Sequence, residues 1–290
     1  MKEFFRYYII TPVKDLFLYM ALVIFGRNIT MARSWNQLTA VQLCGVAAAL
    51  EHFHKFKDCH PKEFQPAHYS KLYVALVKNL LRVNNFGKVW IALWQIPSEE
   101  YQDYVKFLLG EITRTNFLPA FKIKNHIYFP PADRLQNISI KEFSFIDSLY
   151  YNWRKTQDIR YLDMLCATLY RPAGSSSKEI DPRRSFDKFF VEKDVKAIKR
   201  LRYRKKLGIA YTYEGCRNYI VKQYPHVFPA PEKEEKKIKK IQVSYTPFGK
   251  LLHFKIQFDH SKLELVQNLN IHDFFGPYEN ELIEMKNKKE

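Results

Sequence analysis

The sequence predicts a mainly α-helical protein, built from successive helical hairpins with a short β excursion near residues 120–130. Two observations predict the helices: apolar residues recur every three or four positions along several stretches, and capping residues stand before many of them. A third observation is the stretch 118–131, where aromatic and aliphatic residues alternate among prolines, as in strands. Hydrophobic residues make up 47% of the 290, enough for a sizeable core.

The first predicted helices lie between residues 40 and 114. Thr39 and Gln42 form a capping box ahead of a helix over about 40–56. A second helix is expected over about 67–83, residues 89–96 fit a helix or a strand, and a further helix runs from 97 to about 114. The residues expected on the inner faces are Val41, Cys44, Ala48, Phe53, Leu72, Leu76, Leu80, Val83, Tyr101, Val105, Leu108 and Ile112.

An αα-hairpin is predicted after the β excursion. Ser139 and Glu142 have capping-box spacing and start a helix that runs to about Trp153. Asp158 caps the next helix, which Pro172 ends, and the short loop between the two helices favours an antiparallel pair. The residues expected to be buried are Phe143, Ile146, Leu149, Trp153, Leu162, Leu165, Cys166 and Leu169.

The remaining elements are a basic helix over about 187–206 and a helix over about 209–224. Residues 225–231 are rich in proline and form the best candidate linker. A charged helix is expected at 232–240, a helix or strand at 246–258, and a further helix start at Ser261.

Three regions follow from these elements: an N-terminal extension (1–34), a helical domain (35–228), and a linker with a smaller C-terminal interaction segment (229–290). The C-terminal segment either docks back or reaches a partner, because its aromatic residues need burial. The apolar run 16–26 is too short to span a bilayer, so a packed helix, a membrane-surface segment or a signal peptide remain as interpretations. Alternatively, Met31 is the true start.

The four cysteines form no CxxC pair, which indicates a reduced compartment rather than a disulfide scaffold. His52, His54, Cys59, His60 and His68 are metal-ligand types, but their spacing matches no zinc motif, so no metal is expected. The sequence contains no phosphate-binding glycine loop and no nucleophile elbow. Asp147, Asp158 and Asp163 are interpreted as cap or surface residues. We therefore expect no enzymatic activity and no cofactor.

The net charge is +17, and residues 183–206 carry eleven Lys or Arg against three acids. Such a helix binds nucleic acid, meets an acidic protein or presents a solvated face, and all three interpretations stay open. The candidate basic face comprises Lys196, Lys199, Arg200, Arg202, Arg204, Lys205 and Lys206.

Residues 214–218 form a second candidate site, because Gly215 lies in the middle of a predicted helix. Glycine there costs about 1 kcal/mol relative to alanine. It indicates either a close helix–helix approach or partner contact, or a tolerated kink. Glu214, Gly215 and Arg217 are the candidate packing or partner residues, with an ion pair expected between Glu214 and Arg217.

Three segments stand out together: Glu142-Phe143 with Tyr150-Tyr151; Tyr161-Leu162 with Ala167-Thr168-Leu169-Tyr170-Arg171-Pro172; and Tyr213-Glu214-Gly215-Cys216-Arg217-Asn218 with Tyr224-Pro225 and Phe228. This pattern, over roughly 95–228, resembles a family of phage and prophage proteins encoded in structural, often tail, modules. The resemblance implies a helical assembly component or chaperone without a cofactor, whose partners are other phage structural proteins. It also implies a location in the host cytoplasm or on the virion. A nucleic-acid-binding role of the basic face is the alternative function.

Overall fold

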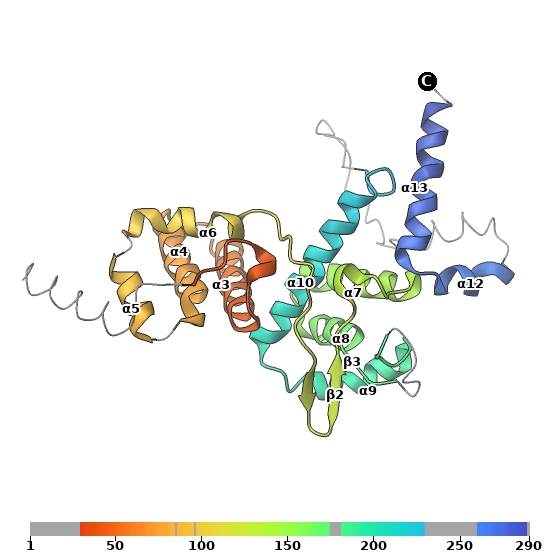
Figure 1. Ribbon diagram of the computed structural model, residues 1–290, viewed down its shortest axis with the longest axis horizontal. Helices are drawn as coiled ribbons and strands as arrows, with labels where there is room; N and C mark the ends of the chain where they lie inside the picture. The colour runs from red at the N-terminus through yellow and green to blue at the C-terminus, as the bar shows by residue number, and fades with distance from the viewer. Residues whose placement is uncertain (1–29, 85, 96, 175–180, 230–259, 289–290) are drawn as a thin grey trace, which may run out of the picture. The chain divides into compact units, whose positions relative to one another are not determined.

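A computed structural model describes residues 30–84, 86–95, 97–174, 181–229 and 260–288 (Figure 1). Over these residues the fold is mainly α-helical with a small three-stranded antiparallel sheet, which confirms the predicted fold class. Backbone contacts divide the chain into two compact units, Met1–Glu111 (unit 1) and Ile112–Glu290 (unit 2). This division falls inside the predicted region 35–228, and the boundaries of independently folding domains stay a prediction.

Unit 1 consists of helices joined by short turns. Its described elements are η2 (Trp35–Gln37), α3 (Ala40–Cys59), α4 (Ala67–Leu80), η3 (Leu81–Val83), α5 (Phe86–Gln95), η4 (Ser98–Glu100) and α6 (Tyr101–Leu109). Helix α4 packs against both α3 and α6. The predicted capping box is confirmed: Thr39 Oγ1 accepts from the Gln42 amide, and Gln42 Oε1 accepts from the Thr39 amide at 2.9 Å. Residues 89–95 are helical.

Three predictions in unit 1 are wrong in detail. Val41 and Val83 were expected to face inward but are 58% and 41% exposed, and α4 ends at Leu80, before Val83. The buried face of α3 is formed instead by Leu43, Val46, Ala47, Leu50 and Phe53. The helix expected to reach residue 114 ends at Leu109, because Gly110 is extended (ψ −157°) and glycine disfavours helix continuation.

Unit 2 contains the sheet and the remaining helices. Its elements are β1 (Phe121–Ile123), β2 (His126–Phe129), η5 (Asp133–Leu135), α7 (Ile140–Thr156), α8 (Ile159–Leu169), β3 (Arg171–Pro172), α9 (Lys188–Ile198), α10 (Tyr203–Gln223), η6 (His260–Lys262), α12 (Leu263–Asn268) and α13 (Ile271–Asn287). The predicted αα-hairpin is confirmed as α7 and α8, which pack on each other, and all the residues expected inside it are buried. Ser139 and Asp158 cap the two helices by accepting from the amides of Glu142 and Arg160 at 3.2 and 2.9 Å.

The predicted β excursion is the hairpin of β1 and β2, and β3 pairs with the other edge of β2. Tyr170, which directly precedes β3, is fully buried and stacks on Phe121 with ring centroids 4.8 Å apart. Its hydroxyl donates to the Leu118 carbonyl at 2.7 Å. The end of α8 is therefore tied to the chain that enters the hairpin.

The single basic helix predicted over 187–206 is wrong. The structure has two helices, α9 and α10, separated by a turn at residues 199–202, where Arg202 leaves the helical conformation (ψ 137°). Each helix packs against α8 separately. Val191 and Ile198 are buried on α9, and Leu207 is buried on α10, so the break lets both helices bury an apolar face.

The C-terminal residues pack against the start of α7 (Figure 1). Backbone hydrogen bonds join Ile140 to Leu269 at 2.9 Å and Ile271 to Ile138 at 3.0 Å. Phe275 is fully buried, with ring contacts to Phe143, Tyr224, Phe228 and Phe274. The described part of the C-terminal segment therefore docks onto the rest of unit 2. The N-cap residue of α12 is Lys262 rather than the predicted Ser261.

Several predictions lie outside the described residues: the apolar run 16–26, the helix at 232–240 and the element at 246–258. Of the helices that the structure does describe, none combines the length and the apolar character needed to cross a membrane.

The cysteines differ in burial, which gives a direct test of unit 2. Burial raises the pKa of the Cys166 and Cys216 thiols, whereas Cys59 is exposed and Cys44 is half-buried. Because the thiolate is the reactive form, Cys166 and Cys216 should react with a disulfide reagent at pH 8 only after unfolding. Cys59 should react at once, and Cys59→Ser should abolish this fast phase. Fast reaction of all four thiols in the native protein would contradict the described packing.

Candidate functional site

The structure divides the predicted basic face into an exposed part and a buried part. Lys196, Lys199, Arg200, Arg202 and Arg204 are exposed at the end of α9, in the turn and at the start of α10. All five lie within the short stretch 196–204.

Lys205 and Lys206 do not share this position. The Lys205 ammonium lies 3.8 Å from the ring centroid of Phe121 on β1. Lys206 is only 5% exposed, and its Nζ lies 2.6 Å from Asp163 Oδ1 on α8. The prediction that Lys206 belongs to the basic face is therefore wrong, because its ammonium group is buried and paired with Asp163.

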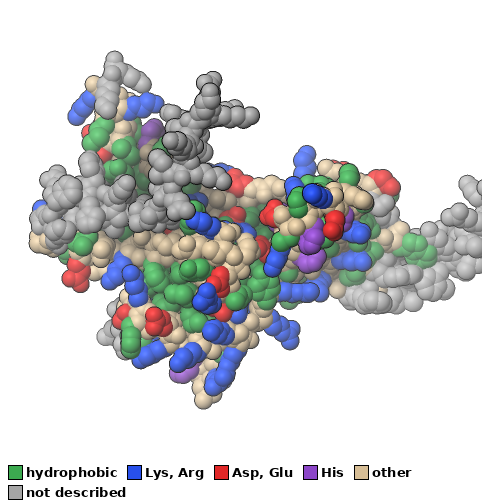
Figure 2. Space-filling model, turned by 180° about the vertical axis from the view of Figure 1, so that it is seen from behind, with side chains coloured by type: hydrophobic (Ala, Val, Ile, Leu, Met, Phe, Trp, Pro, Cys, Tyr) green, Lys and Arg blue, Asp and Glu red, His purple; other side chains and the backbone are tan. Residues whose placement is uncertain are grey.

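The β1–β2 hairpin extends the exposed cations beyond the predicted face. Lys122 and Lys124 are exposed on it, and the contact between Lys205 and Phe121 joins the hairpin to the start of α10. Lys and Arg side chains gather over the lower end of the molecule, where this hairpin lies (Figure 2). This contribution could not be recognised from the sequence, because β1 begins at Phe121 whereas the predicted basic face begins at Lys196.

Large apolar side chains are exposed among these cations. Phe189 on α9 is 61% exposed, Tyr203 at the start of α10 is 47% exposed, and Ile127 on β2 is 49% exposed. The Lys193 ammonium lies 4.2 Å from the ring centroid of Phe189. The surface thus combines positive charge with accessible rings.

Residues 214–218 contact two other segments of unit 2. Glu214 accepts from Arg154 of α7, and Arg217 Nε donates to Asp147 Oδ1 of α7 at 2.7 Å. Each of the two charges that were expected to pair locally therefore has a partner on α7. Asp147 is buried and also accepts from the Tyr213 hydroxyl at 3.0 Å, so its interpretation as a surface residue was wrong.

Gly215 lies against residues 112–115, which belong to no helix or strand, rather than against another helix. A Cβ atom on Gly215 would lie 2.1 Å from the Arg114 carbonyl oxygen. Two residues that follow it in α10 bind the same segment: Cys216 Sγ donates to the Thr115 carbonyl at 3.4 Å and Asn218 Nδ2 donates to the Ile112 carbonyl at 3.1 Å. The glycine therefore permits the close approach of residues 112–115 to α10. The close neighbour is not the second helix that the sequence led us to expect, and the alternative contact with a partner stays a prediction.

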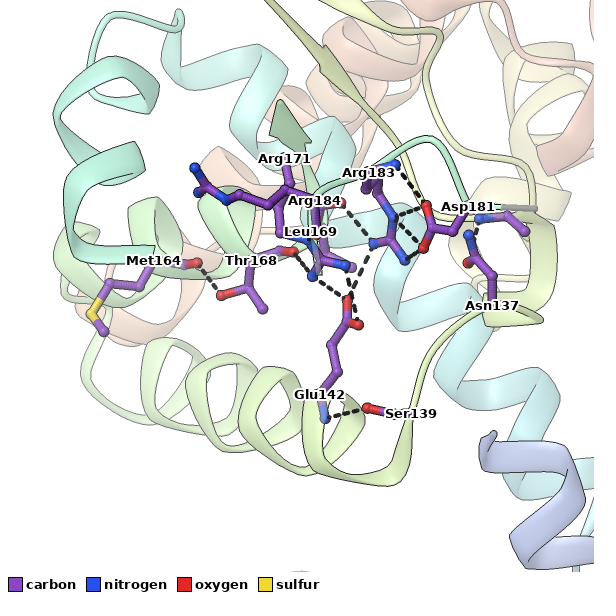
Figure 3. A network of polar contacts seen from close by, with 11 residues as sticks. Asn137, Ser139, Glu142, Met164, Thr168, Leu169, Arg171, Asp181, Arg183 and Arg184 are labelled. Carbon is purple, nitrogen blue, oxygen red and sulfur yellow. Dashed lines mark hydrogen bonds and ion pairs between the residues drawn. The ribbon is translucent and has the colours of Figure 1, made fainter. Parts of the chain in front are cut away.

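A buried ion network joins α7 to the chain around β3 (Figure 3). Glu142 accepts from Arg171 Nη1 at 2.6 Å and Nη2 at 3.3 Å, and from Arg183 Nη1 at 3.2 Å. Arg183 in turn is held by Asp181 at 2.7 Å. Glu142, Arg171 and Arg183 are each at most 3% exposed.

The arginines of this network are also fixed by backbone carbonyls. Arg171 donates to Thr168 and Arg184 at 3.0 and 2.7 Å, and Arg183 donates to Leu169 at 3.2 Å. Burial lowers the pKa of the Arg171 guanidinium, and the Glu142 charge opposes this effect. The network was not predicted from the sequence. The signals that could have indicated it are Arg171, between Tyr170 and Pro172, and Glu142, beside Phe143.

The buried carboxylates of Glu142, Asp147 and Asp163 thus each contact a cation of unit 2. Burial raises the pKa of the Tyr150 hydroxyl, and the neighbouring Glu214 raises it further. These contacts have the geometry of ion pairs that hold helices together.

The histidines and cysteine singled out in the sequence belong to unit 1. His52, His54, Cys59 and His60 are exposed and His68 is half-buried; Phe56 stacks on His60 and His68 at about 5 Å. Within the described residues, no three potential ligands are grouped as a metal site would need.

Comparison of the chain with models of protein families, with curated proteins and with solved structures finds no match.

Proposed function

We propose that the chain is a non-enzymatic structural or assembly protein of a phage-type particle, which acts through contacts with other structural proteins in the host cytoplasm or on the virion. One observation carries the proposal. The polar residues of the phage-like segments are the residues that hold unit 2 together: Glu142 with Arg171, and Glu214 to Asn218 with α7 and residues 112–115.

This placement favours a role of these residues in stabilising the fold rather than in catalysing a reaction. A motif built for a reaction would direct its polar groups towards a substrate, whereas these groups bind one another and the backbone. A rigid helical unit of this kind suits a protein whose exposed side chains bind partners.

The surface of α12 offers a position for such a contact. Leu265 is 72% exposed and Leu269 is 42% exposed, although both are large and apolar. Exposed apolar residues are enriched where proteins meet, so we assign part of the partner contact to this helix.

The proposal is tested by co-expressing the full chain with each structural protein encoded beside it and measuring the mass of the eluting species by light scattering. We expect a complex of fixed stoichiometry that survives 0.3 M NaCl. Leu265→Lys should weaken it at least ten-fold, whereas Asn268→Lys, which adds the same charge to the same helix, should not. Elution of the chain alone in every combination would refute the proposal.

A further inference from the structure

We propose that unit 2 binds single-stranded nucleic acid on its basic surface, defined as the exposed side of α9, the 199–202 turn, the first residues of α10 (203–204) and the β1–β2 hairpin. This inference goes beyond the proposed function and does not depend on it.

The outward side of α9 is a stripe of cations. Val191, Asp194 and Ile198 are buried and define the inner side of the helix. The opposite side carries Lys193 and Lys196 at helical spacing, Arg200 follows in the turn after the helix, and all three are exposed.

The turn after α9 continues this stripe around unit 2. Arg202 and Arg204 follow directly, and the Lys205–Phe121 contact brings the hairpin, with Lys122 and Lys124, to the same region. The cations therefore come from segments separated in sequence but joined in the fold.

Little of this charge is neutralised by acids within 188–206. Asp194 is buried and pairs with Arg184 at 2.6 Å, and Glu192 is exposed on α9. A polyanion that crosses the surface would thus meet several cations, and would gain affinity by releasing its counterions.

The exposed rings favour nucleic acid over an acidic protein. Phe189 lies at the start of the α9 stripe and Tyr203 lies beyond its end, with exposed fractions of 61% and 47%. Proteins that bind single strands combine a basic surface with rings on which bases stack. Bases paired in a duplex are not accessible for such stacking, so a single strand fits this surface better.

The test uses fluorescence anisotropy with the full chain and labelled 20-nucleotide oligo-dT, oligo-rU and a duplex of equal length. We expect binding of a single strand to persist at 150 mM NaCl and to exceed duplex binding. The stronger of the DNA and RNA arms identifies the natural ligand class.

Two variants separate stacking from charge. Phe189→Ala with Tyr203→Ala should weaken binding about ten-fold or more at an unchanged salt slope. Arg200→Glu with Arg204→Glu should also lower the log–log salt slope, by about 1.4 if both residues contact phosphates. Lys141→Glu with Lys155→Glu, an equal change of charge at exposed positions of α7, is the matched control and should bind as wild type.

Two outcomes would overturn the inference. The first is loss of binding by 150 mM NaCl, because any protein of charge +17 binds nucleic acid at low salt and releases it as the salt concentration rises. The second is wild-type affinity of the variant that carries Phe189→Ala and Tyr203→Ala. Tighter binding of poly-glutamate than of either oligonucleotide would show instead that the surface receives an acidic protein. Circular dichroism must confirm that each variant is folded.

Discussion

Glu142→Gln is expected to destabilise unit 2 by about 3–5 kcal/mol, because it leaves two buried guanidinium groups without their shared carboxylate. Arg171 and Arg183 are nearly inaccessible to water, so solvent cannot replace the lost charge. The same loss at an exposed ion pair would be small.

The measurement is the urea dependence of Cys166 and Cys216 reactivity, which reports on the unfolding of unit 2 alone. The matched control is Arg160→Met, which removes an 80%-exposed guanidinium paired with Asp158 and should leave the urea midpoint unchanged. Adding Arg171→Met to Glu142→Gln should cost less than the sum of the single changes. Additive effects would mean that the two residues do not interact.

Gly215→Ala is the second large effect that we expect, with a loss of about 3–5 kcal/mol. The new methyl group would overlap the backbone of Arg114, which cannot move aside as a flexible side chain could. Displacing residues 112–115 would also weaken the hydrogen bonds from Cys216 and Asn218, at about 1 kcal/mol each.

Gly110→Ala provides the control for this prediction. Its backbone is extended with a negative φ, and a Cβ there meets no atom within 4 Å, so alanine should be tolerated. Both variants are compared by circular dichroism for the whole chain, and Gly215→Ala is measured by the reactivity of Cys166 and Cys216 as well, because Gly110 lies in unit 1. A Gly215→Ala protein with wild-type stability would contradict the packing of residues 112–115 on α10.

Local signals in the sequence predicted most of the helices. Thr39, Ser139 and Asp158 act within a few residues of the chain, so their roles as caps can be recognised without tertiary contacts. The spacing of Phe143, Ile146 and Trp153 likewise identified a buried face.

Long-range contacts decided the features that the sequence did not predict. Charged residues such as Asp147, Asp163 and Lys206 are usually exposed to solvent. Their burial is tolerated here because each forms an ion pair with a residue of another helix. The break between α9 and α10 at residues 199–202 also depends on tertiary contacts, because both helices pack against α8. The basic surface was predicted only in part, because β1 and β2 contribute to it from a distant stretch of sequence.

The most direct test of the proposed assembly role is a deletion of the gene in the host that produces the particles. We expect that particles are then absent or incomplete by electron microscopy. Wild-type protein should restore them, and so should Asn268→Lys, whereas Leu265→Lys should not. Normal particles in the deletion strain would contradict the account.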